Sequence, residues 1–174
     1  MSSSLSIRLA DVDDINTICF LAQQIWPVTY KEILSKEMLD YMLNLFYSPE
    51  SLARQILEQK HIFLLLEDQE EPLGFASYSL LPDSDVYKLH KLYVLPNRQG
   101  QGLGRILIDF ILEEIRSKGA VTLRLNVNRN NKAKIFYEKL GFTVVYEEDV
   151  DIGNNFLMTD YVMEKKLDRH LRTT

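Results

Sequence analysis

The 174-residue sequence predicts one domain, spanning residues 1–174, of the α/β class with helices and strands mixed along the chain. Residues 87–127 have the pattern strand, glycine loop, helix, strand, which is a βαβ unit. Apolar residues at helical spacing dominate the first 60 residues, whereas the segments that flank the βαβ unit are mostly predicted as strands. With 46% hydrophobic and 26% charged residues, the composition suits a single buried core.

Three helices are predicted before the first strand. Asp11 resembles an N-cap ahead of an apolar stripe, and we expect Pro27 to stop this first helix. Ser35 caps the second helix, and Ser48-Pro49 opens the third with a cap and a proline at the first helical position.

The rest of the chain alternates strands with two further helices. Strands are predicted at 61–68, 73–81, 87–95, 121–127, 142–148 and 156–165, the first two as a hairpin. The helix after the glycines begins near Leu103 and ends at Gly119, and a short helix over about 131–140 ends at Gly141.

Composition excludes several classes of protein. The net charge of −5 argues against a general nucleic-acid binder. The run 62–66 is too short to cross a membrane, and residues 1–10 lack the pattern of a secretory signal. A single cysteine, Cys19, cannot form an internal disulfide, so we expect a cytoplasmic protein; no metal is implied.

Charge is unevenly distributed along the sequence. Residues 98–139 contain nine basic and four acidic residues, so the remainder carries the negative surplus. This asymmetry suits an anionic cofactor on one side and a cationic substrate on the other, although a randomly mixed surface explains it equally well.

The glycine loop at Gly100, Gly102 and Gly104 predicts a phosphate site. A strand that runs through glycines into a helix gathers free backbone N–H groups at the positive end of the helix dipole. Because Gly104 is followed by Arg105 and Ile106, a P-loop is excluded, and the G-x-G-x-G spacing fits a dinucleotide fingerprint poorly. A turn that only tightens the corner is the simpler alternative.

Two sequence blocks resemble the GNAT superfamily of N-acetyltransferases. The first is Gln99-x-x-Gly102-x-Gly104; the second runs from Asn130 through Ala133 and Phe136-Tyr137 to Gly141-Phe142. Either block alone is a weak signal, but the two in this order on the predicted βαβ unit are a strong one. The resemblance implies a central, mixed, mostly antiparallel twisted sheet in which two parallel strands splay apart, flanked by helices.

The resemblance also implies acetyl-CoA as cofactor. Its pyrophosphate would lie on the glycine loop and its pantetheine along the strand before it, so the expected cofactor-binding residues are Leu92, Tyr93, Val94, Gln99, Gly100, Gln101, Gly102, Leu103, Gly104, Arg105, Asn130 and Tyr137. The Val94 N–H would stabilise the oxyanion formed by amine attack. Tyr137 would be the catalytic proton donor to the departing thiolate, with core packing and helix capping as the simpler roles of Tyr137 and Asn130.

An attacking alkyl amine must first lose a proton, because its ordinary pKa is about 10.4. Alternation along the strand places His90 on the face of Leu92 and Val94, so His90 is the candidate catalytic base. A half-exposed strand histidine without a catalytic role is the alternative. Glu67, near a strand end, is one of the weaker acidic candidates.

The acceptor is predicted to be a small-molecule amine. Residues 25–34 lie where such enzymes shape the acceptor site, so Trp26 and Tyr30 are the candidate substrate-binding residues, with aromatic packing as the alternative. The N-terminal segment and residues 153–167 resemble bacterial spermidine/spermine acetyltransferases. The acidic run at 147–151 suits a polyamine by charge, although an exposed acidic turn explains it equally well. Acetylation of a protein N-terminus or lysine, or non-catalytic acyl-CoA sensing, remain alternatives, and the resemblance also allows a homodimer.

Overall fold

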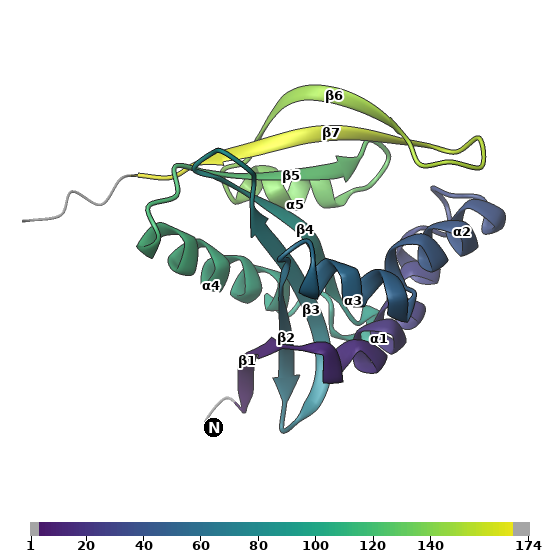
Figure 1. Cartoon of the computed structure of the whole chain (residues 1–174), viewed down its shortest axis with the longest axis horizontal. Helices are drawn as coiled ribbons and strands as arrows, with labels where there is room; N and C mark the ends of the chain where they lie inside the picture. Colours follow the sequence, from purple (N-terminus) through teal and green to yellow (C-terminus); the bar gives the residue numbers. More distant parts are fainter. Residues whose placement is uncertain (1–3, 169–174) are drawn as a thin grey trace, which may run out of the picture. The chain divides into compact units, whose positions relative to one another are not determined.

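The structure is a computed structural model that describes residues 4–168. Its strands are β1 (Leu5–Ala10), β2 (Ile62–Asp68), β3 (Glu71–Leu80), β4 (Val86–Val94), β5 (Thr122–Asn128), β6 (Thr143–Asp151) and β7 (Leu157–Lys166). Its α-helices are α1 (Ile15–Thr29), α2 (Lys36–Tyr47), α3 (Pro49–Leu57), α4 (Leu103–Ser117) and α5 (Ala133–Lys139), with short 3₁₀ turns η1 (Val12–Asp14) and η2 (Pro96–Arg98) (Figure 1).

The seven strands are hydrogen-bonded in the order β1-β2-β3-β4-β5-β7-β6. The pairs β1/β2, β2/β3, β5/β7 and β6/β7 are antiparallel, whereas β4 and β5 run parallel, as a βαβ unit requires. The predicted mixed, mostly antiparallel sheet with flanking helices is therefore confirmed. Parallel pairing covers only Val86–Leu89 and Thr122–Leu125, although both strands continue further.

The chain divides into two compact units, the first made of residues 4–79 and 91–110. Its helices α1, α2 and α3 contact one another (Figure 1). The core combines the buried face of α1, such as Ile18 and Leu21, with the continuous buried run 63–66 of β2. An almost wholly apolar strand is expected where a sheet is covered on both faces, and residues 73–79 of β3 are also buried.

The second unit contains residues 80–90 and 111–168. Alternating residues Leu123, Leu125 and Val127 of β5 are buried, as the period-two pattern predicts. The strands β6 and β7 form a long hairpin (Figure 1). β6 stands at the end of the strand order, and Val144, Val145 and Tyr146 on it are each at least 40% exposed.

The structure corrects the prediction that Pro27 stops the first helix, because α1 continues to Thr29. Proline has a backbone φ suited to a helix, and its missing N–H frees only the carbonyl of Gln23. Gln23 is exposed, so water can bind that carbonyl. The helix then ends normally, with the Tyr30 N–H donating to Trp26 O at 2.9 Å.

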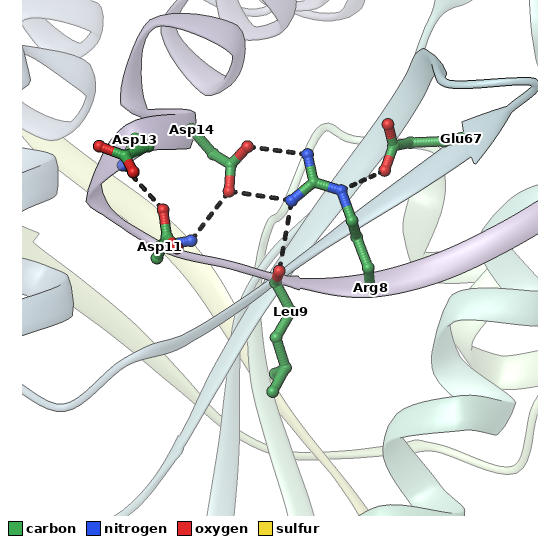
Figure 2. A network of polar contacts seen from close by, with 6 residues as sticks. All are labelled: Arg8, Leu9, Asp11, Asp13, Asp14 and Glu67. Carbon is green, nitrogen blue, oxygen red and sulfur yellow. Dashed lines mark hydrogen bonds and ion pairs between the residues drawn. The ribbon is translucent and has the colours of Figure 1, made fainter.

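A strand that the sequence pattern missed, β1, is anchored by Arg8. Both terminal nitrogens of Arg8 donate to the Asp14 carboxylate, at 2.8 and 3.0 Å, and its Nε donates to Glu67 on β2 (Figure 2). Asp14 also accepts from the Asp11 N–H, which completes a capping box with the Asp11 side chain. Arg8 therefore joins β1 to the start of α1 and to β2.

Within residues 4–168, no helix is both long and apolar enough to span a bilayer.

Candidate active site

The glycine loop lies between β4 and α4 in the first unit. Gly100 and Gly102 have φ of +78° and +75°, a left-handed conformation that only glycine adopts without strain. A Cβ added at either would have no atom within 4 Å, so open space surrounds this backbone. Gly104 lies inside α4 and lacks a positive φ, so backbone conformation alone does not explain that glycine.

Several predicted loop residues contact their neighbours in this unit. The Gln99 side chain donates to Val94 O at 3.4 Å, which joins the loop to the end of β4. Arg105 lies 3.7 Å from Asp109 on the exposed surface of α4. Arg98, which the prediction did not include, donates to the Gln101 side chain at 3.2 Å.

Gly74 on β3 is a functional candidate that the sequence analysis missed. A Cβ at Gly74 would lie 2.6 Å from Tyr93 O and 3.2 Å from Val94 Cα, so glycine allows the two strands to approach closely. The Leu95 N–H donates to Leu73 O at 2.8 Å beside this contact. An isolated glycine within an apolar strand was the available signal.

Trp26 and Tyr30, the predicted acceptor residues, come together with Tyr93 in what we call the aromatic cluster. The Trp26 ring centroid lies 4.6 Å from that of Tyr30 and 5.7 Å from that of Tyr93. The hydroxyls of Tyr30 and Tyr93 are hydrogen-bonded at 2.9 Å. Tyr47 packs behind Trp26 at 5.4 Å between ring centroids. Tyr93, predicted to contact the cofactor, thus belongs to the same group as the acceptor candidates.

Tyr137 and Asn130 lie in the second unit. Tyr137 is 8% exposed, and its ring packs edge-on against Phe136 and Phe142, at 5.2 and 5.7 Å between centroids. Asn130 is exposed; the side chains that accept backbone N–H groups at this turn are those of Asn128 and Asn131. Asn130 is therefore not seen to cap α5; of its neighbours, Asn131 binds the N–H of Ala133, the first residue of the helix.

His90 is half-buried on β4 in the second unit, between the buried residues Leu89 and Lys91. It directly follows the last parallel pair, Leu89 with Leu125. Further along the strand the alternation shifts, because Leu92 and Tyr93 are both half-buried and Val94 is buried. The burial pattern therefore does not support the prediction that His90, Leu92 and Val94 share one face of the strand.

The acidic run lies on β6, and its carboxylates already have partners in the second unit. Arg129 pairs with Glu147 at 3.4 Å and with Asp149, and Glu148 accepts from the Asn126 side chain at 2.9 Å. Asn126 also donates to Asp160 at 3.2 Å, and burial raises the pKa of the Asp160 carboxyl. Arg129 supplies one positive charge and Asn126 supplies none, so the run has partners but keeps a net negative charge. Glu67, one of the weaker base candidates, is bound by Arg8 in the first unit.

Comparison with known proteins identifies the family. A family model described as an acetyltransferase (GNAT) domain matches residues 30–165. A spermidine N(1)-acetyltransferase of Thermoplasma acidophilum is 29% identical over 168 residues, covering 94% of this chain and 98% of that protein. A ribosomal protein bS18-alanine N-acetyltransferase of Haemophilus influenzae is 32% identical over 98 residues, covering 56% of this chain and 62% of that protein.

A solved structure agrees with these sequences. The PaiA N-acetyltransferase of Thermoplasma acidophilum, in complex with coenzyme A, superimposes with a TM-score of 0.80 at 28% identity, covering 94% of this chain and 99% of that one. The chain belongs to the GNAT family. It is an acetyl-CoA-dependent N-acetyltransferase.

Proposed function

We propose that this enzyme acetylates a primary amine of a small molecule, with a polyamine as the leading acceptor. The observation that carries the proposal is similarity over nearly the whole length to a protein named as a spermidine N(1)-acetyltransferase. The aromatic cluster adds weaker support: aromatic rings attract alkylammonium groups, but Trp26 and Tyr30 are only 4% and 8% exposed, as packed aromatic residues are. Because carboxylates of β6 already pair with Arg129, they support a polyamine acceptor less than the sequence alone suggested.

The glycine loop fits the cofactor. Open backbone at Gly100 and Gly102, directly before α4, offers N–H groups to a pyrophosphate without a side chain in the way. In the proposal, the loop from Gln99 to Arg105 holds the phosphates, and the residues Leu92, Tyr93 and Val94 with Asn130 hold the pantetheine arm.

The chemistry follows from what the amine and thioester require. The acceptor nitrogen attacks the thioester carbonyl, and the Val94 N–H donates to the oxygen as negative charge develops on it. Tyr137 then donates its phenolic proton to the leaving sulfur. A phenol with an ordinary pKa of about 10 can protonate a thiolate whose conjugate acid has a pKa of about 8.5. His90 is the proposed base that receives the ammonium proton of the acceptor, directly or through water.

The first experiment is thiol release from acetyl-CoA with a panel of spermidine, spermine, amino sugars, amino acids and short peptides. Turnover with polyamines and little with the other amines supports the proposal. Turnover only with peptides would replace it by protein acetylation. Coenzyme A binding without turnover on any amine would favour an acyl-CoA sensor.

Tyr137→Phe is the sharpest test of the proton donor. We expect kcat to fall about 10²- to 10⁴-fold, the usual contribution of a general acid, with the Kd of coenzyme A unchanged. Tyr146→Phe is the matched control, because Tyr146 is an exposed tyrosine on β6 and should retain full activity. Equal activity of the two variants would remove Tyr137 from the mechanism.

Protein acetylation is the second candidate function. Its support is the matching region of a relative named for acetylating an alanine of ribosomal protein bS18. A cytoplasmic location, a single domain and a homodimer remain predictions from the sequence.

A further inference from the structure

Lys91 is a buried amine that the proposed mechanism does not use. It lies on β4 in the first unit and is only 9% exposed. Its Nζ donates to Gln55 Oε1 at 2.7 Å and lies 5.4 Å from the Tyr47 ring centroid and 5.6 Å from that of Phe63. Full burial of a lysine is rare unless a carboxylate pairs with it.

The amide of Gln55 is held by its other contacts. Its Nε2 donates to Phe46 O at 2.9 Å and to Ser51 Oγ at 3.1 Å, so its oxygen must face Lys91. Through this amide Lys91 connects β4 to α3 and to the end of α2. The contact fixes the position of Lys91 as well as that of Gln55.

No acidic side chain in the described residues compensates a charge on Lys91. None of the ion pairs found in residues 4–168 includes it, and burial lowers its pKa to about 7. The residues facing it are Tyr47 from α2, Gln55 from α3 and Phe63 from β2. Burial raises the pKa of Tyr47 well above its ordinary value, so that phenol stays neutral. Protonation of Lys91 therefore places an isolated positive charge among these buried side chains.

The side chains around Lys91 contact the aromatic cluster through Tyr47. Tyr47, which Lys91 approaches, packs against Trp26, and Trp26 packs against both Tyr30 and Tyr93. Ser77, which pairs with Phe63 across β2 and β3, has a buried hydroxyl without a hydrogen bond among the described residues.

We propose that Lys91 is a specificity-determining positioning residue: its uncharged amine holds the Gln55 amide beside Tyr47 and behind the aromatic cluster, and its protonation weakens binding of a cationic acceptor. The proposal rests on the proposed function, in which the cluster receives the ammonium groups of the acceptor. A positive charge behind these rings opposes such an acceptor across a region of low dielectric. The affinity for the anionic cofactor should not be weakened by this charge.

The test compares acceptor KM with the Kd of coenzyme A between pH 6 and pH 9. The uncharged fraction of a group with a pKa near 7 falls about tenfold between pH 8 and pH 6, so the wild-type acceptor KM should rise by up to about tenfold. Lys91→Met, which is apolar and similar in length, should show at most a twofold rise. The Kd of coenzyme A should have the same pH dependence in both proteins. Equal pH dependence of acceptor KM in both would overturn the proposal.

A second measurement needs no substrate and separates this proposal from the proposed function. The folded pKa of Lys91 lies below its unfolded value of 10.5, so the unfolded chain binds more protons between these two values. The free energy of unfolding should therefore rise with pH from about 7 to 10.5 in the wild type, and rise less in Lys91→Met and Lys91→Gln. Failure to turn over any amine would reject the proposed function and with it the effect of Lys91 on acceptor binding, whereas the stability profile would still report whether Lys91 titrates. An identical stability profile in wild type and variants would reject the titration of Lys91.

Discussion

Gly74, Tyr93 and Val94 illustrate how much depends on single residues. The proposed oxyanion donor is a backbone N–H, so its position depends on the strand beside it and on no side chain of its own. Glycine at position 74 lets that neighbouring strand approach the peptide between Tyr93 and Val94 more closely than any other residue would. A residue that touches no substrate can therefore position the reacting group.

Gly74→Ala should reduce both stability and cofactor affinity. The added methyl group would meet backbone atoms, and overpacking of this kind costs roughly 1–3 kcal/mol. Because Val94 must shift, we expect the Kd of coenzyme A, measured by calorimetry, to rise.

Ala76→Gly is the matched control for this change. Ala76 is a fully buried residue on the same face of β3, and its loss destabilises the strand without pushing β4. A Kd equally affected in both variants would indicate general destabilisation.

Elements differ in how far the sequence determines them. The helices α2 and α3 begin at the predicted caps, and Ser35 and Ser48 accept from the N–H groups of Met38 and Ser51. The sequence pattern did not predict β1, because this strand is short and largely exposed. A strand of this kind depends on its partner, here β2. The burial of Lys91 also depends on tertiary packing, since α3 supplies its hydrogen-bond acceptor. Family motifs identified the loop, but no local pattern indicates which side chains meet across elements.

The attachment of β1 predicts a pH-dependent stability. Hydrogen bonds from Arg8 lower the pKa of the Asp14 carboxyl, so they stabilise the fold above the ordinary value of 3.8 and lose this effect as the pH falls through the folded value. Arg8→Met should reduce the free energy of unfolding by about 1 kcal/mol at pH 7, a modest value because Arg8 is half exposed to screening solvent.

Denaturant melts at pH 7 and pH 2.5 provide the measurement for Arg8. The deficit of Arg8→Met should shrink at the lower pH. Lys36→Met is the control, because it removes an exposed pair with Asp40 at 2.6 Å within one helix. A deficit that is the same at both pH values would show that Arg8 acts by packing alone.

At the scale of the whole molecule, β4 and α4 each belong to both compact units. Neither unit can lose these elements without breaking a continuous strand or helix, so we expect one cooperative unfolding transition, as the single-domain prediction requires.

The measurement uses two probes. Trp26 is the one tryptophan of the sequence and lies in the first unit, so its fluorescence reports on that unit. Hydrogen exchange at Leu123 and Leu125 reports on the second. Coincident midpoints in urea support one domain, whereas separated midpoints would divide the chain into two.

The position of β6 at the end of the sheet affects how the enzyme behaves in concentrated solution. An open strand edge is a template for adding a strand of another molecule, and the exposed apolar residues Val144 to Tyr146 increase that risk. The carboxylates that follow on the same strand act as gatekeepers, because repulsion between copies discourages stacking. Replacing Glu147 or Glu148 to test amine recognition would also weaken this protection against aggregation. Light scattering should therefore accompany activity measurements on every β6 variant.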